Sequence, residues 1–309
     1  MRDRFVRTLH ECAKVDPRVV LVVGDLGFGV LNEYAASLPS QYLNAGVAEQ
    51  NMTSIATGMA LEGHVAFTYS IANFPTLRCL EQIRNDAAYH DANVNVVSIG
   101  GGFSYGTLGM SHHATEDLAI MRAIPQVTVV SPGCLWETEQ ATRALIAEPG
   151  TGFLRLDKSG AGETGREGEL FELGKPRLLR KGEDVTILTT GGVLGEVLGA
   201  EKVLREQGTR CDVFSCHTLK PFRVDEVLAS ISGTGRVVCV EEHSVTGGLA
   251  GLIAETCMDS GVTPRWFKRI GITGGFCAEV GSQAYLRRRY GLDAASIEKA
   301  VREWVRSDD

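Results

Sequence analysis

The fold is constrained most by short runs of β-branched residues that alternate along the chain with segments of helical periodicity. In the N-terminal half, such runs lie at Val19–Val23, Val94–Ile99 and Val127–Val130. Strands that are apolar along their whole length are typical of parallel sheets covered by helices on both faces. The sequence therefore predicts an α/β fold. Helices are expected between the strands over 3–14, 49–63, 75–90 and 114–123.

A second series of the same kind occupies the C-terminal half of the chain. Its expected strands are Val185–Thr189, Cys211–Ser215 and Arg236–Glu241. A polar, turn-rich stretch between the two series favours a linker with one edge hairpin. We therefore expect two domains, 1–165 and 183–309, joined by a linker over 166–182.

The composition argues against several classes of function. Of the 309 residues, 44% are hydrophobic and 22% are charged, and the net charge of −7 gives no support for nucleic acid or an anionic membrane as a partner. No apolar run reaches the roughly 18 residues that a membrane span needs, and the N-terminus lacks the apolar core of a signal peptide. The eight cysteines form no CxxC pair and lie mostly in apolar segments, which argues against zinc or disulfides and favours a reducing cytoplasm.

A glycine-rich turn at Gly191–Gly195 follows an expected strand and precedes an expected helix, as nucleotide-binding turns do. The full G-x-G-x-x-G pattern is absent, and no acidic residue ends the following strand. We interpret this segment as a tight strand-to-helix turn.

The segment Asn44–Met52 (Asn-Ala-Gly-Val-Ala-Glu-Gln-Asn-Met) resembles the glutamate motif of the transketolase family's pyrimidine-binding domain. By itself, a glutamate that opens a helix, as Glu49 does, is explained as a partner of the helix dipole. Further segments resemble the family's successive motifs in the same order, at 81–85, 109–117, 121–125, 240–243 and 247–249. The resemblance covers nearly the whole chain. It implies two doubly wound domains, a pyrimidine-binding domain followed by a smaller transketolase C-terminal domain.

The same resemblance implies thiamine diphosphate as the cofactor, which carries most of the hard chemistry. A glutamate bonded to N1′ of the aminopyrimidine drives the ring to its imino tautomer by sharing a proton with it. An apolar pocket favours this short hydrogen bond. The resemblance assigns the role to Glu49.

Three further residues are candidates for contact with the cofactor. Phe74 lies where the family places an aromatic wall for the pyrimidine, and Ile71 lies where a second aromatic ring is expected. Asp25 is similar to a family acidic residue at a strand end near the cofactor interface. On the residues alone, Phe74 is also explained as a core side chain and Asp25 as a loop-capping aspartate.

The family holds Mg²⁺, and through it the diphosphate, with a Gly-Asp-Gly…Asn motif. This chain has no Gly-Asp-Gly, and its nearest match is Gly24-Asp25-Leu26. The resemblance therefore implies a partner subunit that carries the motif and the Mg²⁺. Active sites would then lie at the interfaces of an α₂β₂ assembly.

Four residues are candidates for contact with a small-molecule substrate. Arg2 and Lys158 lie near the family's phosphate-binding arginines, although a lysine lacks the bidentate fork. His112 resembles the family histidine beside the reacting carbon, which bonds donor hydroxyls or shuttles protons, and is the second catalytic candidate. His113 adjoins it. With no Cys or third His nearby, this pair does not suggest a metal site.

Three positions depart from the family's pattern. Gly100 falls where a substrate-binding histidine is usual, Leu108 replaces an aspartate that contacts sugar hydroxyls, and Gly29 falls where a phosphate-binding serine is expected. Buried polar groups left unpaired cost about 1–3 kcal/mol each. We therefore expect a roomier and more apolar substrate pocket, which makes a modified or non-phosphorylated substrate an option.

Together, these patterns favour a subunit of a transketolase-like transferase that moves a two-carbon ketol unit. The alternative is the β subunit of a 2-oxo-acid decarboxylating enzyme, which shares the architecture and the glutamate. Arg2 and the run Ser111–Asp117 look more like transketolase. A cofactor-free scaffolding subunit is a third hypothesis, and the retained Glu49 argues against it.

Overall fold

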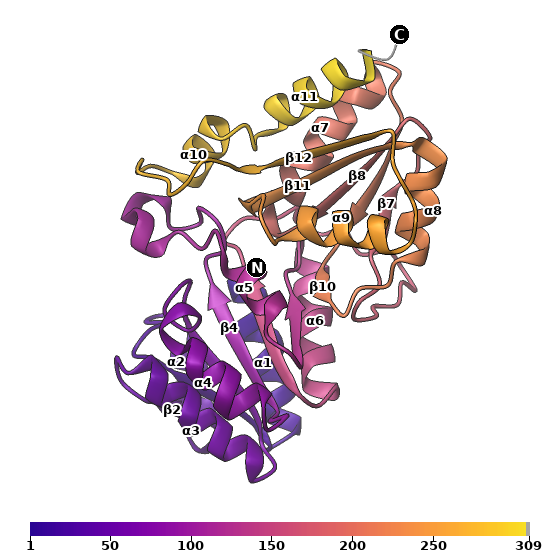
Figure 1. The fold of residues 1–309 in the computed structure, drawn as a ribbon. Coiled ribbons are helices and arrows are strands. Elements are labelled where there is room, and N and C mark those ends of the chain that lie inside the picture. Colours follow the sequence, from indigo (N-terminus) through magenta and orange to yellow (C-terminus); the bar gives the residue numbers. More distant parts are fainter. Residues whose placement is uncertain (307–309) are drawn as a thin grey trace.

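The computed structural model describes residues 1–306, which form two α/β units, one above the other in Figure 1. The first sheet has the strand order β10-β5-β6-β4-β3-β1-β2. Its strands are β1 (Val19–Val23), β2 (Tyr42–Asn44), β3 (Val65–Ile71), β4 (Val94–Ile99), β5 (Val127–Val130), β6 (Thr151–Leu156) and β10 (Thr218–Lys220). Neighbouring strands pair in parallel, except that β10 arrives from the second half of the chain and pairs antiparallel with β5.

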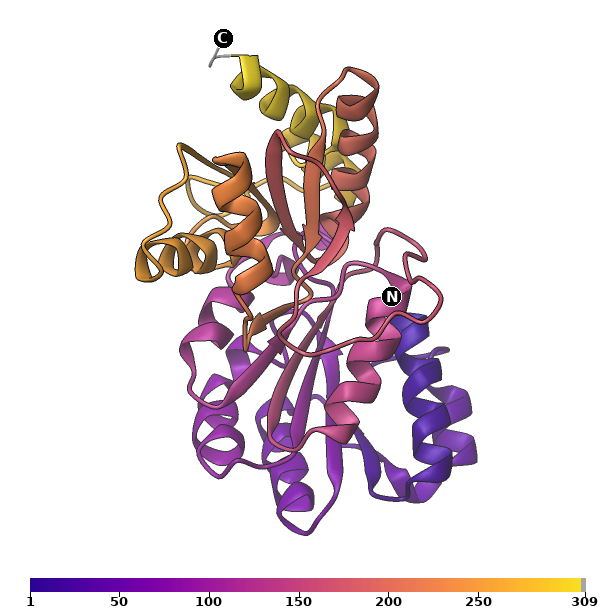
Figure 2. The same cartoon turned by 90° about the vertical axis from the view of Figure 1, so that its right-hand side faces the viewer.

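Alternate residues of β1 belong to two separate cores, which explains why the whole strand is apolar. Val19, Leu21 and Val23 pack with α1 and α6, which lie side by side in Figure 2. Val20 and Val22 pack with α3 and α5 on the opposite face. The helices of this unit are α1 (Arg2–Val15), α2 (Asn32–Ser37), α3 (Glu49–Leu61), α5 (Asp117–Ala123) and α6 (Leu135–Ala147). The predicted doubly wound arrangement is confirmed.

The segment predicted as one helix over 75–90 is irregular instead. It consists of a 3-10 turn (Leu77–Cys79), the short α4 (Leu80–Gln82) and a π-helical turn (Ile83–Ala88). In keeping with the wider winding, the N–H of Tyr89 donates to the carbonyl of Arg84 at 3.1 Å. Such turns often occur at functional sites. The helix expected from residue 114 begins at Asp117.

The second sheet has the strand order β12-β11-β8-β9-β7, and Figure 1 shows α7 and α11 on one face of it and α8 and α9 on the other. Its strands are β7 (Arg177–Arg180), β8 (Val185–Thr190), β9 (Cys211–Ser215), β11 (Arg236–Ser244) and β12 (Trp266–Ile272). The helices are α7 (Leu194–Glu206), α8 (Asp225–Thr234), α9 (Leu249–Asp259), α10 (Gln283–Arg289) and α11 (Ala294–Arg306). β7 lies inside the segment expected to be a linker, and it pairs antiparallel with β9 as a single edge strand rather than as a hairpin.

Buried charges join the two units. Arg155, which is 1% exposed, donates to Asp117 Oδ2 at 3.0 Å and to the carbonyl of Glu242 at 2.9 Å. The Glu242 carboxylate in turn accepts from Arg287 Nε at 2.5 Å. Because removing one member of a buried ion pair strands the other, this network ties the folding of one unit to that of the other.

The turn at Gly191–Gly195 belongs to the same interface. Gly191–Val193 forms a 3-10 turn between β8 and α7, which confirms the interpretation as a strand-to-helix turn. The N–H of Gly192 donates to the Asp157 carboxylate of the first unit. A Cβ at Gly192 would lie 2.6 Å from the same carboxylate oxygen, so the turn needs glycine to approach it.

Within residues 1–306, no helix is both long enough and apolar enough to cross a membrane. The same residues contain no group of three or more His, Cys, Asp or Glu side chains placed to hold a metal ion.

Candidate active site at the carboxyl edge of the first sheet

The predicted site residues gather at one edge of the first sheet. Parallel strands end at the same edge, so the loops that follow them meet there, and such edges are the usual binding sites of α/β folds. Asp25 follows β1, Glu49 follows β2, Ile71 ends β3 and Lys158 follows β6. The long loop after β4 contributes His112.

Glu49 is the first residue of α3, where the positive end of the helix dipole favours a carboxylate. Its side chain is 5% exposed and packs against Gly24, where a Cβ would lie 3.4 Å from Glu49 Cγ. The carboxylate borders a cavity of about 370 Å³, lined by Val47, Ala48, Glu49, Gln50, Asn51 and Arg78. A buried acid therefore faces an open cavity.

Arg78 is the side chain that hydrogen-bonds this carboxylate within the described part of the chain. Its Nη1 lies 3.2 Å from Glu49 Oε1 and 3.3 Å from Oε2. Its guanidinium also lies over the Phe74 ring, with Cζ 4.0 Å from the ring centroid. Sequence reasoning overlooked Arg78, although it stands three residues before the motif at 81–85. Glu49 and Phe74 are thus brought together, with Arg78 touching both.

His112 lies next to this group. Its ring packs edge-on against Phe74, with centroids 5.1 Å apart, and Ser111 Oγ lies 3.0 Å from Nδ1. Burial lowers the pKa of His112, and the nearby charge of Arg78 lowers it further. The neutral imidazole is therefore favoured, which suits a group that accepts or passes on a proton.

His113, predicted to contact substrate, points the other way. Its side chain is buried, packs edge-on against Phe103 at 5.2 Å and lies 3.4 Å from the Gly106 carbonyl through Nε2. The Asn73 side chain donates to the His113 carbonyl at 2.8 Å, which fastens this loop to the end of β3. The structure therefore brings His112 to the cavity side of the loop and His113 to its interior.

Asp25 and Ile71 lie at the ends of β1 and β3. Asp25 has a left-handed backbone with φ of 55°, and its Oδ1 accepts from Asn44 Nδ2 at 2.9 Å. Asn44 Oδ1 accepts in return from the N–H groups of Asp25 and Gly46. The pair fixes the two loops on either side of the Glu49 helix start. Ile71 is half-buried.

A second cavity near the same edge, of about 320 Å³, is lined by Met1, Arg2, Asp3 and Lys158. Lys158 Nζ lies 3.6 Å from the centroid of the Tyr105 ring. Partial burial lowers the pKa of Lys158, and the charge of Arg2 adds to this effect. Two neighbouring cations that repel each other favour an anion between them.

The expected roominess of the substrate pocket is wrong at Gly100. This glycine has φ of +105°, and a Cβ there would clash with two carbons of the Tyr105 ring. The Tyr105 side chain therefore fills the space that a residue at this position would need. At Gly29 no atom lies within 4 Å of such a Cβ, and Leu108 is 53% exposed, so these two positions do border open space.

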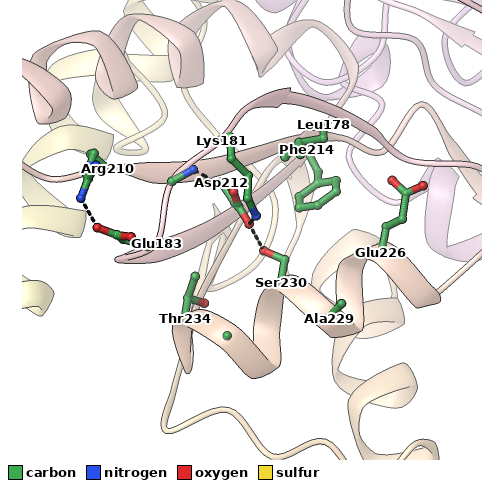
Figure 3. Close-up of a pocket in the computed structure, with 12 residues that line it drawn as sticks. Leu178, Lys181, Glu183, Arg210, Asp212, Phe214, Glu226, Ala229, Ser230 and Thr234 are labelled. Carbon is green, nitrogen blue, oxygen red and sulfur yellow. Dashed lines mark hydrogen bonds and ion pairs between the residues drawn. The ribbon is translucent and has the colours of Figure 1, made fainter.

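Another cavity, of about 580 Å³, lies in the second unit between β9 and α8 (Figure 3). Its buried acid is Asp212, which is 1% exposed. The Asp212 carboxylate accepts from Lys181 Nζ at 3.0 Å, from the N–H of Gly182 at 2.8 Å and from Ser230 Oγ at 2.6 Å. Its hydrogen-bonding capacity is used within the domain, so the contacts point to a structural role.

The comparisons with known proteins agree with this geometry. Residues 1–162 match the family described as the transketolase pyrimidine binding domain, and residues 174–297 match the transketolase C-terminal domain. A 6-deoxy-6-sulfo-D-fructose transketolase subunit from Clostridium sp. (strain MSTE9) is 36% identical over 98% of this chain and 94% of its own length. One of the two apulose-4-phosphate transketolase subunits of Phocaeicola vulgatus is 33% identical over 99% of this chain and 97% of its own length.

Solved structures give the same picture. A split gene transketolase, described as an inactive beta4 tetramer, has a TM-score of 0.86 and 30% identity, and the match covers 98% of this chain and 96% of that one. A transketolase from Campylobacter jejuni has a TM-score of 0.80 at 18% identity, covering 98% of this chain and 46% of the other. The latter likeness shows a shared fold.

Proposed function

Because the chain belongs to the transketolase family, as a β-type subunit of a split transketolase, we propose that it binds the aminopyrimidine end of thiamine diphosphate. In a complex with a second subunit, it would then transfer a two-carbon ketol unit. The observation that carries this proposal is the buried Glu49 carboxylate, which faces a cavity beside an aromatic ring.

The residues present fit such a ring. The Arg78 guanidinium is planar and donates N–H, and it contacts both the Glu49 carboxylate and the face of Phe74. An aminopyrimidine is also planar and carries N–H donors. The site therefore accepts the shape and the hydrogen-bonding pattern that the cofactor requires.

In the proposed mechanism, Glu49 holds a proton in a hydrogen bond to N1′ of the pyrimidine. Its burial excludes water, and the start of α3 keeps its carboxylate in place. Phe74 supports the ring, with Ile71 and Asp25 shaping the loops around it. When bound, the cofactor supplies the reactive carbon that takes up and releases the two-carbon unit. His112, kept neutral by its lowered pKa, bonds the substrate hydroxyls or moves a proton between them.

The cations Arg2 and Lys158 support a substrate that ends in an anionic group. Two of the relatives are named for substrates of this kind, a 6-deoxy-6-sulfo-D-fructose and an apulose 4-phosphate. Sulfonate and phosphate share the tetrahedral oxyanion that an arginine and a lysine bind. We therefore propose a ketose with a terminal sulfonate or phosphate.

A partner subunit would hold the diphosphate and Mg²⁺ through a Gly-Asp-Gly…Asn motif, because this chain has no such motif. The assembly would be α₂β₂, with sites at the interfaces between the two kinds of chain. The inactivity stated for the β₄ form of the related split transketolase supports the need for a partner. The naming of the relatives as transketolase subunits favours a transferase over a decarboxylating enzyme.

The test is reconstitution. Titration calorimetry with thiamine diphosphate and Mg²⁺ should show tight binding to the complex with the co-purified diphosphate-binding subunit. The isolated chain should show no tight binding and no turnover of any ketose phosphate or 2-oxo acid. Robust turnover by this chain, shown to be free of a partner, would overturn the split-enzyme proposal.

A further inference from the structure

Arg78 occupies an unusual position for an arginine at the surface. One nitrogen, Nη1, lies at nearly equal distances of 3.2 and 3.3 Å from the two oxygens of Glu49, so it covers both acceptors at once. The guanidinium plane also takes up one face of Phe74, with Cζ 4.0 Å from the centroid. These are the two groups that the proposed function gives to the pyrimidine ring.

We propose that Arg78 is a positioning residue of the cofactor site that competes directly with the pyrimidine ring. This inference rests on the proposed function. A ring cannot bond the Glu49 oxygens and lie against Phe74 while the guanidinium holds both. Arg78 therefore keeps Glu49 paired in the empty site and has to leave before the ring binds.

The contacts of Arg78 make such an exchange inexpensive. Its side chain is 50% exposed, whereas the Glu49 side chain is 5% exposed, so the arginine can turn into water while the carboxylate stays in place. An ion pair with one exposed partner contributes little net stability. Leaving the buried carboxylate without any partner would cost more. Arg78 thus protects Glu49 in the free subunit at a small penalty to cofactor binding.

The surrounding backbone agrees with a role in exchange. Arg78 lies in the 3-10 turn Leu77–Cys79 at the irregular start of the segment over 77–88, not inside a regular helix. Its neighbour Cys79 is buried and donates to the Phe74 carbonyl at 3.3 Å, which fixes the turn next to the ring. The backbone is therefore anchored, and the movement that exchange requires is confined to the long side chain of Arg78.

The experiment is a calorimetric titration of thiamine diphosphate with Mg²⁺ into the reconstituted complex carrying Arg78→Ala. Removing the competitor should tighten the dissociation constant by about threefold to tenfold, in line with the small value of a partly exposed ion pair. Arg78→Lys retains the charge but not the plane, and should give an intermediate value. The matched control is Arg18→Ala, which removes an exposed arginine paired with Asp16 at the opposite end of β1 and should leave the constant unchanged.

The sign of the change decides the matter. Weaker or unchanged binding in a folded Arg78→Ala complex, verified by circular dichroism, would show that Arg78 contacts the cofactor or does nothing, and would overturn the inference. The wild-type complex separates this failure from that of the proposed function. If the wild-type complex does not bind thiamine diphosphate at all, both are wrong; if it binds and Arg78→Ala binds more weakly, only the competition is wrong.

Discussion

The two sheets each place a buried carboxylate beside a cavity, and the two acids differ in what satisfies them. Asp212, beside the larger cavity of about 580 Å³, accepts from a backbone N–H, a hydroxyl and a lysine, all from its own domain. Glu49, beside a cavity of about 370 Å³, is bonded through its carboxylate to one half-exposed arginine.

The difference teaches how to separate a structural acid from a binding acid. Partners such as the Gly182 N–H cannot leave without unfolding the turn, so Asp212 is committed to the fold. Arg78 can turn into solvent, so Glu49 can exchange its partner for a ligand. Cavity volume alone would have selected Asp212, whereas the freedom of the partners selects Glu49.

The largest expected effect comes from exchanging the roles of these two acids. Glu49→Gln should lower turnover of the reconstituted complex by about 10²–10⁴-fold, because the shared proton is lost while the shape is kept. Asp212→Asn should leave turnover nearly unchanged and lower the free energy of unfolding by about 1–3 kcal/mol. Steady-state kinetics and urea unfolding of both variants measure the two effects. Loss of turnover in Asp212→Asn without destabilisation would break the distinction.

A second prediction concerns the place where the two regions meet. Arg155→Met removes the cation that pairs with Asp117 and bonds the Glu242 carbonyl. An uncompensated buried charge remains, so we expect the free energy of unfolding to fall by about 3–5 kcal/mol. Urea denaturation followed by circular dichroism measures the loss. A change within error would mean that the regions are not coupled through this network.

A third prediction compares two histidines. Burial lowers the pKa of His217 to about 4, with Glu137 acting upward and Arg177 downward. In the unfolded chain the pKa is about 6.5, so as pH falls from 6.5 to 4 the unfolded chain binds a proton that the folded chain does not. Stability from this group is therefore complete above pH 6.5 and lost through that window.

His217→Phe, which keeps a ring against Phe171, should flatten this part of the profile, with a difference of about 2–3 kcal/mol between pH 7 and pH 4. Turnover at pH 7 should not change, because His217 lies away from the cavity edge that carries His112. The measurement is urea unfolding at several pH values. An unaltered pH profile in the variant would refute the assignment.

The smallest expected effect separates two lysines. Lys158→Ala should raise KM for a sulfonated or phosphorylated ketose by about tenfold with little change in kcat, since one charge-assisted contact is lost. Lys181→Ala, which removes the lysine of the second cavity, serves as the control and should leave KM unchanged. Equal KM values in the two variants would remove Lys158 from the substrate site.

Much of the fold could be predicted because apolar strands state their own burial. The runs Val19–Val23 and Cys211–Ser215 form strands with those bounds. Pairings between distant segments gave no such signal. The short β10 leaves the second half to join β5, and β7 forms one edge strand, because these contacts depend on tertiary packing.

The site could be predicted in its motif and not in its details. Glu49, Phe74 and His112 come together as the motif order suggested. The opposite directions of His112 and His113 depend on how the loop after β4 is fastened, which spacing cannot give. Tyr105 fills the space at Gly100 for the same reason, because a glycine records only that a side chain is missing.

The most direct test of the central claim is the exchange of the C2 proton of bound thiamine diphosphate for deuterium in the reconstituted complex. In Glu49→Gln, with cofactor binding and fold verified, exchange should slow by about 10²–10⁴-fold relative to wild type. Wild-type exchange rates in a folded, cofactor-loaded Glu49→Gln complex would contradict the catalytic assignment. Glu49 would then be a helix-terminal carboxylate and nothing more.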